Sequence, residues 1–339
     1  MDLQAGWQAY KLRVKRRRLM WRSFRSRHQL TCLNDRSAGL ADDAILAFTT
    51  IRNEAHRLPY FLSHYRALGV SHFFFVDNMS SDGSAEMLAG EPDVSIWQTG
   101  ASYKASRFGM DWLGWLLMHY GRRHWCLTVD ADEILVFPHY PARDLRDLTL
   151  WLDAQSIPAF GALMLDMYPK GPVGEVPYQA GDDPFDTLCW FDNGPWTIRR
   201  QRPMQNLWLQ GGVRERAFFA KNPRRGPTLN KLPLIRWNLR YSYVNSTHSM
   251  LPSRLNNAYE GPGGPGPSGV LLHSKFLDTV VERSREEQAR GEHFNNPDLF
   301  NGYYDWLANN PQLWTPSSER YEGPDQLEKL GLMTRGDWV

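Results

Sequence analysis

The sequence contains few cysteines and no long apolar run. Its three cysteines, Cys32, Cys126 and Cys189, are far apart and match neither a metal-ligand spacing nor a disulfide framework. No run of about 18 apolar residues is present, so no transmembrane helix is expected. The N-terminus also lacks the apolar core of a signal peptide. These absences predict a cytoplasmic protein.

Two nucleotide-binding fingerprints are also missing. No GxGxxG follows the first apolar strand, and no GxxxxGK[ST] occurs anywhere in the 339 residues. Dinucleotide oxidoreductases and P-loop kinases are therefore disfavoured. With 42% apolar and 22% charged residues, the chain has the composition of a globular protein that can bury a large core.

Positive charge is concentrated at the N-terminus. The net charge is +2, but residues 1–27 carry nine Lys/Arg and one acid, which makes this segment +8 and the remainder −6. Apolar residues gather on one face of a helix predicted over residues 1–28. Such a helix can lie on the inner, anionic face of a membrane. The alternatives are a helix packed on the domain with solvated arginines, or a nucleic-acid-binding arm.

Apolar strands and amphipathic helices alternate through the first half of the chain. Strands are predicted over residues 44–50, 72–76, 94–97 and 125–129, with helices beginning at Leu58, Ser84 and Ser106 between them. These strands are continuously apolar, which is typical of a mostly parallel sheet covered by helices on both faces. Residues 29–43 are expected to form a polar linker.

Polar clusters follow three of these strands, where ligands gather in parallel sheets. The clusters are Thr49–Glu54, Asp77–Ser80 and Asp130–Glu133. Asp130 and Asp132 would share a face if the strand continued through them. Carboxylates of this kind suit Mg²⁺ or Mn²⁺ shared with a substrate phosphate. Alternatively, the acids cap the next turn or pair with nearby arginines.

Three stretches together carry a family resemblance. Residues 50–84 (TIRNEAHRLPYFLSHYRALGVSHFFFVDNMSSDGS) and 129–136 (VDADEILV) resemble the nucleotide-sugar half of GT-A glycosyltransferases, close to family 2 and to its bacterial subgroup with RNE…LPxFLxHY, VDNxSxDG and DxD motifs. LLHSKF, at residues 271–276, resembles the His-x-Lys stretch of related enzymes. The resemblance implies a metal-dependent transferase that uses a nucleoside diphosphate sugar, most often a UDP-sugar.

The resemblance also implies roles for individual residues. Donor-binding positions would be Thr50, Arg52, Glu54, Asp77, Lys104, Arg107, Asp130 and Lys275. Ligands of Mn²⁺ or Mg²⁺ would be Asp130, Asp132 and His273, with His248 as an alternative to His273. Glu133 would support the metal site from outside its first shell. Each residue could instead be structural, for example Glu54 as an acid at a helix start.

The second half is rich in proline and glycine and is expected to form the acceptor side of a cleft. A transferase that inverts the sugar needs a base for the acceptor hydroxyl. Glu215 and Asp166, the latter near the end of a strand predicted over 159–168, are the candidates. Residues 259–269 would form a lid, and residues 279–291 a charged helix.

We therefore expect a basic helix (1–28), a GT-A domain (44–290) and a C-terminal extension packed on the domain (291–339). The domain divides into a nucleotide-sugar half (44–138) and an acceptor half (139–290). The predicted reaction transfers a sugar to a hydroxyl of a glycan or glycolipid in bacterial surface polysaccharide synthesis. The alternatives are a sugar nucleotidyltransferase, which would show a Gly-rich phosphate loop, and a non-catalytic membrane or nucleic-acid binder. No nucleic-acid partner is expected for the enzyme.

Overall fold

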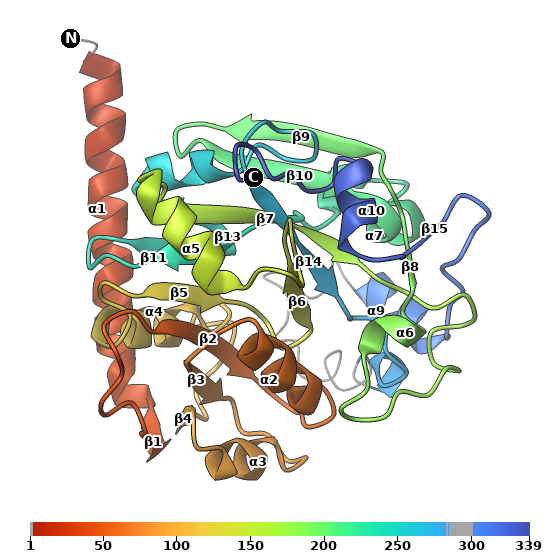
Figure 1. The fold of residues 1–339 in the computed structure, drawn as a ribbon, viewed down its shortest axis with the longest axis horizontal. Helices are drawn as coiled ribbons and strands as arrows, with labels where there is room; N and C mark the ends of the chain where they lie inside the picture. The colour runs from red at the N-terminus through yellow and green to blue at the C-terminus, as the bar shows by residue number, and fades with distance from the viewer. Residues whose placement is uncertain (1–2, 283, 285–300) are drawn as a thin grey trace.

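A nine-stranded sheet forms the centre of the molecule in the computed structural model, which describes residues 3–282, 284 and 301–339 (Figure 1). Its strand order is β1-β4-β3-β2-β5-β11-β7-β14-β6. The strands are β1 (Thr31–Asn34), β2 (Ile45–Ile51), β3 (His72–Asp77), β4 (Val94–Gln98), β5 (Trp125–Thr128), β6 (Glu133–Val136), β7 (Ala159–Asp166), β11 (Asn230–Arg236) and β14 (Ser268–His273).

Six of the nine strands run in the same direction, and β1, β6 and β11 run against them. This confirms the mostly parallel α/β class. β2, β3 and β5 are parallel neighbours, so their carboxyl ends lie at one edge of the sheet. Every residue of β3 is buried, which is why its sequence is continuously apolar rather than alternating.

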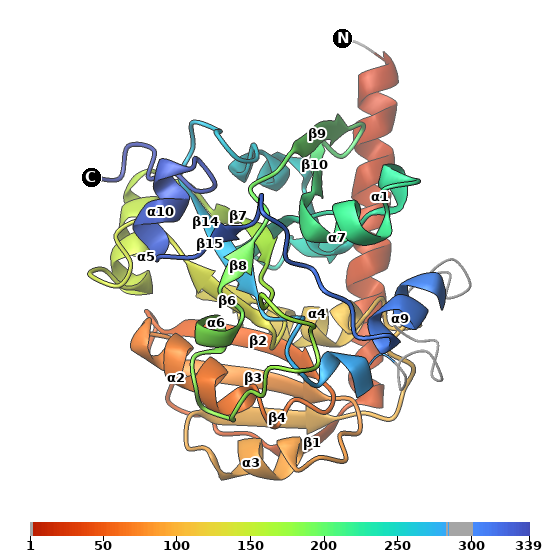
Figure 2. The ribbon, with the colours of Figure 1, turned by 90° about the vertical axis from the view of Figure 1, so that its right-hand side faces the viewer.

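Helices cover both faces of the sheet (Figures 1 and 2). α2 (Leu58–Ala67) lies on one face, and α4 (Met110–His119) lies on the other with α1 (Leu3–Ser26) packed outside it. The short α3 (Ser84–Gly90) joins β3 to β4, and α5 (Leu145–Ala154) joins β6 to β7. An Asp144 cap that accepts from the backbone N–H of Asp147 fixes the start of α5.

Two predictions about the first half need correction. The segment expected as a linker contains β1, which pairs antiparallel with β4 and extends the sheet before residue 44. α4 begins at Met110 rather than Ser106, because the preceding loop turns back against β2. Gly109 makes this approach possible: it has φ +77°, and a Cβ there would lie 2.6 Å from Thr50 Oγ1.

The second half adds small hairpins and short helices to the sheet. The paired strands are β9 (Trp196–Gln201) with β10 (Asn206–Gly211), β12 (Ser242–Val244) with β13 (Ser246–Leu251), and β8 (Trp190–Phe191) with β15 (Glu319–Arg320). The helices are α6 (Pro184–Thr187), α7 (Gly212–Phe218), α9 (Asn301–Ala308) and α10 (Pro324–Lys329), with 3-10 turns at Pro223–Arg225 and Ser253–Ala258. In the first half, a 3-10 turn at Arg27–Gln29 follows α1.

The C-terminal segment returns to the domain. β15 pairs with β8, and the Trp338 ring lies 6.1 Å from that of Phe137 and 6.4 Å from that of Trp151. The expected lid precedes β14 and therefore lies at the opposite end of that strand from His273, so it is not placed to close over the acids. Most of the helix predicted over 279–291 lies outside the described residues.

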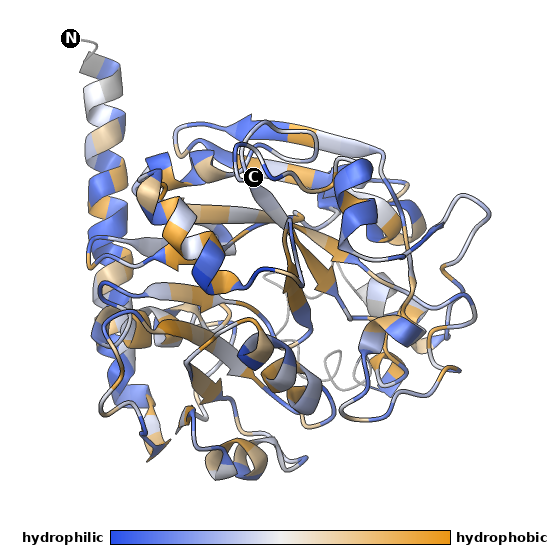
Figure 3. Cartoon of the chain, in the orientation of Figure 1, coloured by the Kyte–Doolittle hydropathy of each residue, from blue (hydrophilic) through white to orange (hydrophobic). Residues whose placement is uncertain are grey.

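α1 runs along one side of the molecule, and its N-terminal turns extend past the rest of the chain (Figures 1 and 2). Apolar and polar residues are interspersed along its whole length (Figure 3). Among the described residues, no helix combines the length and apolar character needed to cross a bilayer.

Candidate active site

The acid cluster after β5 forms a turn rather than a continued strand. β5 ends at Thr128 and β6 starts at Glu133, and the Glu133 N–H donates to the Asp130 carbonyl over 3.0 Å. The expectation that Asp130 and Asp132 share one face of a strand is therefore wrong. The turn sends their carboxylates to different partners.

Lys231 forms ion pairs with two acids of the cluster, Asp130 and Glu133. This β11 lysine, with a side chain only 4% exposed, places Nζ 3.1 Å from Asp130 Oδ2 and 2.8 Å from Glu133 Oε1. Burial raises the pKa of Glu133 to about 7 although Lys231 opposes that shift. Burial alone would lower the pKa of Lys231, but Asp130 and Glu133 raise it. Lys231 is therefore the cation that compensates these acids inside the sheet.

Asp132 belongs to a second, buried chain of charges. His273 Nε2 lies 3.1 Å from Asp132 Oδ2, and its Nδ1 lies 2.6 Å from Asp166 Oδ1. Parallel pairing of β14 with β7 sets His273 directly beside Asp166. Arg214 Nε on α7 then donates to Asp166 Oδ2 over 2.7 Å. The order along the chain is Asp132, His273, Asp166, Arg214.

The charges in this chain support one another. Burial alone would lower the pKa of His273, but Asp132 raises it. Burial alone would raise the pKa of Asp132, but His273 holds it well below its ordinary value. Arg57 and Lys275 lower the Asp132 pKa further. Both ring nitrogens of His273 face carboxylates, so the imidazolium satisfies both contacts.

The residues fit a metal only in part. Within the described ranges, no group of three or more His, Cys, Asp or Glu is arranged to hold an ion. Asp130 faces Lys231, whereas Asp132 and His273 remain side by side. Asp166 contacts His273 at Nδ1, in the same way that carboxylates contact the ring nitrogen of a metal-binding histidine that does not bind the metal. This arrangement suits an incomplete shell of two protein ligands, which a phosphate-bound Mg²⁺ or Mn²⁺ commonly has.

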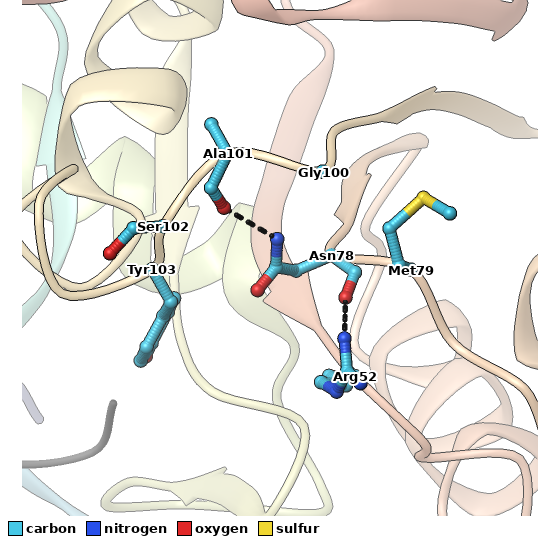
Figure 4. A pocket seen from close by; sticks show the side chains of 7 residues that line it. All are labelled: Arg52, Asn78, Met79, Gly100, Ala101, Ser102 and Tyr103. Carbon is cyan, nitrogen blue, oxygen red and sulfur yellow. Dashed lines mark hydrogen bonds between the residues drawn. The ribbon is translucent and has the colours of Figure 1, made fainter. Parts of the chain in front are cut away.

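A polar cavity lies at the carboxyl ends of β2, β3 and β4. Its volume is about 260 Å³, and its lining residues are Arg52, Asn78, Met79, Gly100, Ala101, Ser102 and Tyr103 (Figure 4). Arg52 Nη1 donates to the Asn78 carbonyl over 2.5 Å. The Asn78 amide donates to the carbonyls of Thr99 and Ala101, which joins the loop after β4 to the end of β3.

Two predicted donor-binding residues, Asp77 and Glu54, have structural partners, and a third, Thr50, is covered by Gly109. Asp77 is fully buried and accepts from Ser80 and from the Gln98 side chain. Glu54 pairs with Arg57 at 2.8 Å, and Arg57 also donates to the Ser274 carbonyl. Thr50 lies under Gly109. Of the residues predicted from the first two strand ends, the cavity lining contains Arg52 but neither Asp77 nor Thr50.

The predicted cations occupy different surroundings. Arg107 pairs with Asp111 at 2.7 Å and donates to the Tyr243 carbonyl, so it ties the start of α4 to β12. Lys104 directly follows Tyr103 of the cavity lining. Lys275 lies in the turn after β14, where its charge acts on Asp132.

The two candidates for the catalytic base, Asp166 and Glu215, lie in different surroundings. Asp166 is 2% exposed at its side chain, and its two oxygens face His273 and Arg214. This position does not favour proton transfer from an acceptor. Glu215 lies on α7, where burial raises its pKa, and among the described residues its buried Oε2 has no hydrogen-bond partner. His248 Nδ1 contacts the Asn230 carbonyl at 2.6 Å rather than Asp132.

Lys231, Arg214 and Arg57 were not predicted from the sequence. The detectable signal was a lysine directly before the apolar run LPLI of the strand NKLPLIR, because a buried lysine requires an acid partner. Arg214 and Arg57 carry no comparable local signal, since their partners depend on tertiary packing.

Comparisons with known proteins add little. No family model and no curated protein matches the sequence. A crystal structure of 4-diphosphocytidyl-2C-methyl-D-erythritol synthase matches 40% of this chain and 68% of its own, at 14% identity and a TM-score of 0.25. A similarity of this size says nothing about what this chain binds or transforms.

Substitution of Lys231 by methionine should destabilise the fold strongly, because it leaves Glu133 buried without its cation. We expect a loss of about 3 to 5 kcal/mol in the free energy of unfolding, measured in urea. A second change, Glu133→Gln, should restore about half of it. Arg236→Met on the same strand is the control, since its partly exposed pair with Asp153 should contribute about 1 kcal/mol or less. Equal losses in the two single variants would contradict this account.

Proposed function

We propose that the chain is a metal-dependent glycosyltransferase that moves a sugar from a nucleoside diphosphate sugar, a UDP-sugar, to a hydroxyl of a glycan or glycolipid, with inversion. The observation that carries the proposal is the buried contact of His273 with both Asp132 and Asp166. Asp132 lies in the turn after β5. The strand β2 is a parallel neighbour of β5, and Arg52 of the cavity directly follows the carboxyl end of β2. The motifs that resemble GT-A enzymes meet along this edge.

In this proposal, His273 Nε2 would lose its proton when Mn²⁺ or Mg²⁺ binds, so that Asp132 and Nε2 would hold the ion. Asp166 and Arg214 would keep the imidazole in place. The bound ion would neutralise charge on the donor diphosphate. Lys231 compensates Asp130 and Glu133, which limits the acidic repulsion that a diphosphate would meet. The nucleoside would occupy the cavity beside Arg52 and Asn78.

Cationic side chains complete the donor site in this proposal. Lys275 lies within electrostatic reach of Asp132, and Lys104 follows the cavity lining. We propose that both ammonium groups approach the diphosphate, where positive charge stabilises the negative charge that develops on the leaving group. Glu215 is the proposed base, and Asp166 is a positioning residue for His273.

The change Asp132→Asn tests the metal site. We expect Mn²⁺-dependent turnover of the sugar donor to fall at least about 100-fold, because a neutral amide binds the ion poorly. Asp43→Asn is the matched control, since Asp43 forms an exposed surface pair with Arg146. Retention of Mn²⁺-dependent turnover in Asp132→Asn would overturn the proposal. Release of pyrophosphate from a nucleoside triphosphate and a sugar phosphate would instead identify a nucleotidyltransferase.

The change Glu215→Gln tests the base. We expect kcat to fall about 100-fold or more while the dissociation constant of the donor stays the same, because a general base acts only in the transition state. Glu86→Gln on the exposed side of α3 is the control. Asp166→Asn should instead weaken Mn²⁺ binding about 10- to 100-fold. An unchanged kcat in Glu215→Gln would exclude Glu215 as the base.

A further inference from the structure

α1 has an apolar stripe on the side that faces away from the domain. Its inner side packs through Leu19, which contacts Met204 and Leu251 in a small buried cluster, and through Ser26, which donates to the Asp111 carbonyl. The outer residues are Trp7, Tyr10, Val14 and Trp21, at spacings of three, four and seven positions, and Phe24 lies at the edge of this row, where its ring contacts that of Trp115 on α4.

These outer side chains are unusually exposed for their type. Trp7 is 57% exposed, Tyr10 53% and Trp21 59%, in a chain whose other tryptophans are mostly covered. Trp7 and Tyr10 belong to the N-terminal part of α1. The N-terminal turns of this helix extend past the rest of the molecule (Figure 1). Exposed aromatic side chains gathered on one helix face indicate an interaction surface.

Cations border the stripe on both sides. At helical spacing, Lys11, Arg18 and Arg25 follow one border and Arg13 the other, while Arg17 lies within the stripe, in the gap between Val14 and Trp21. Among the described residues, the ion pair recorded for α1 is that of Arg22 with Asp111, and none joins the bordering cations to an acid. The Lys11 ammonium lies 5.2 Å from the centre of the Trp7 ring, which keeps it beside the stripe.

A second copy of α1 is a poor partner for this surface. Positions 7, 10, 14, 17, 21 and 24 are spaced alternately by three and four residues, as in a coiled-coil seam, but Arg17 occupies one of them. The positions that flank such a seam are Lys11, Arg13, Arg18 and Arg25, with no acid among them. Two copies would therefore bring like charges together, whichever way the helices ran.

We infer that α1 is a membrane-docking helix that lies flat on a bilayer rich in anionic lipid. Trp7, Tyr10 and Trp21 would enter the boundary between headgroups and acyl chains. The bordering lysine and arginines would contact lipid phosphates. An anionic bilayer supplies both the apolar layer and the negative charge that this face requires. The inference does not depend on the proposed transfer reaction.

Flotation of the full chain with lipid vesicles tests this inference. We expect at least tenfold more binding to vesicles of 70% phosphatidylcholine and 30% phosphatidylglycerol than to pure phosphatidylcholine, and a fall in binding as salt rises. The triple change Trp7→Ser, Tyr10→Ser, Trp21→Ser should reduce binding at least tenfold. So should Lys11→Gln, Arg18→Gln, Arg25→Gln.

The control is Leu150→Ser, which removes a 63% exposed leucine on α5 and should leave binding unchanged. Unaltered thermal midpoints would show that the variants fold. The inference is overturned if neither triple variant weakens vesicle binding. It is also overturned if the wild-type chain does not bind the vesicles. In that case, binding of a single-stranded RNA oligonucleotide would indicate a nucleic-acid-binding helix, and an α1-dependent dimer in light scattering would indicate a self-association helix.

Discussion

The contact of His273 with two carboxylates is the interaction on which the candidate site depends. It links β14 to β7 through Asp166 and to the turn after β5 through Asp132. Burial makes each charge costly by itself, so the group is stable only as a set in which every charge meets an opposite one. Arg214 completes the set from α7. Substitution of one of these four residues should therefore alter the orientation of the other three side chains.

A second set of charges, built on Lys231, keeps the same turn in place. Lys231 reaches it from β11, which runs between β5 and β7 and antiparallel to both. The turn is thus held from two directions, with Asp130 and Glu133 bound to one strand and Asp132 to another. These cations explain how three acidic side chains within four residues remain close together at the end of a buried strand.

Much of the fold was predictable because its signals are local. The strands at 44–50, 72–76 and 94–97 follow from apolar runs that end at polar residues, and each lies within a residue or two of its observed position. The family resemblance implied that Asp132 and His273 lie together as metal ligands; the structure brings the two side chains together in direct contact, and the metal role remains a prediction. The partners Lys231 and Arg214 were missed because they depend on strand order and on the docking of α7. Asp130 was placed wrongly relative to Asp132 because a turn, not a strand, connects them.

The most direct test of the account is a thermal-shift screen of UDP-, GDP-, CMP- and dTDP-sugars with and without Mn²⁺. A ligand that binds only the folded state raises the Tm, by an amount that grows with its concentration relative to Kd. The account predicts that one of these donors raises the Tm by several degrees with Mn²⁺ and much less without it. No shift with any donor, or the same shift without the ion, would contradict it.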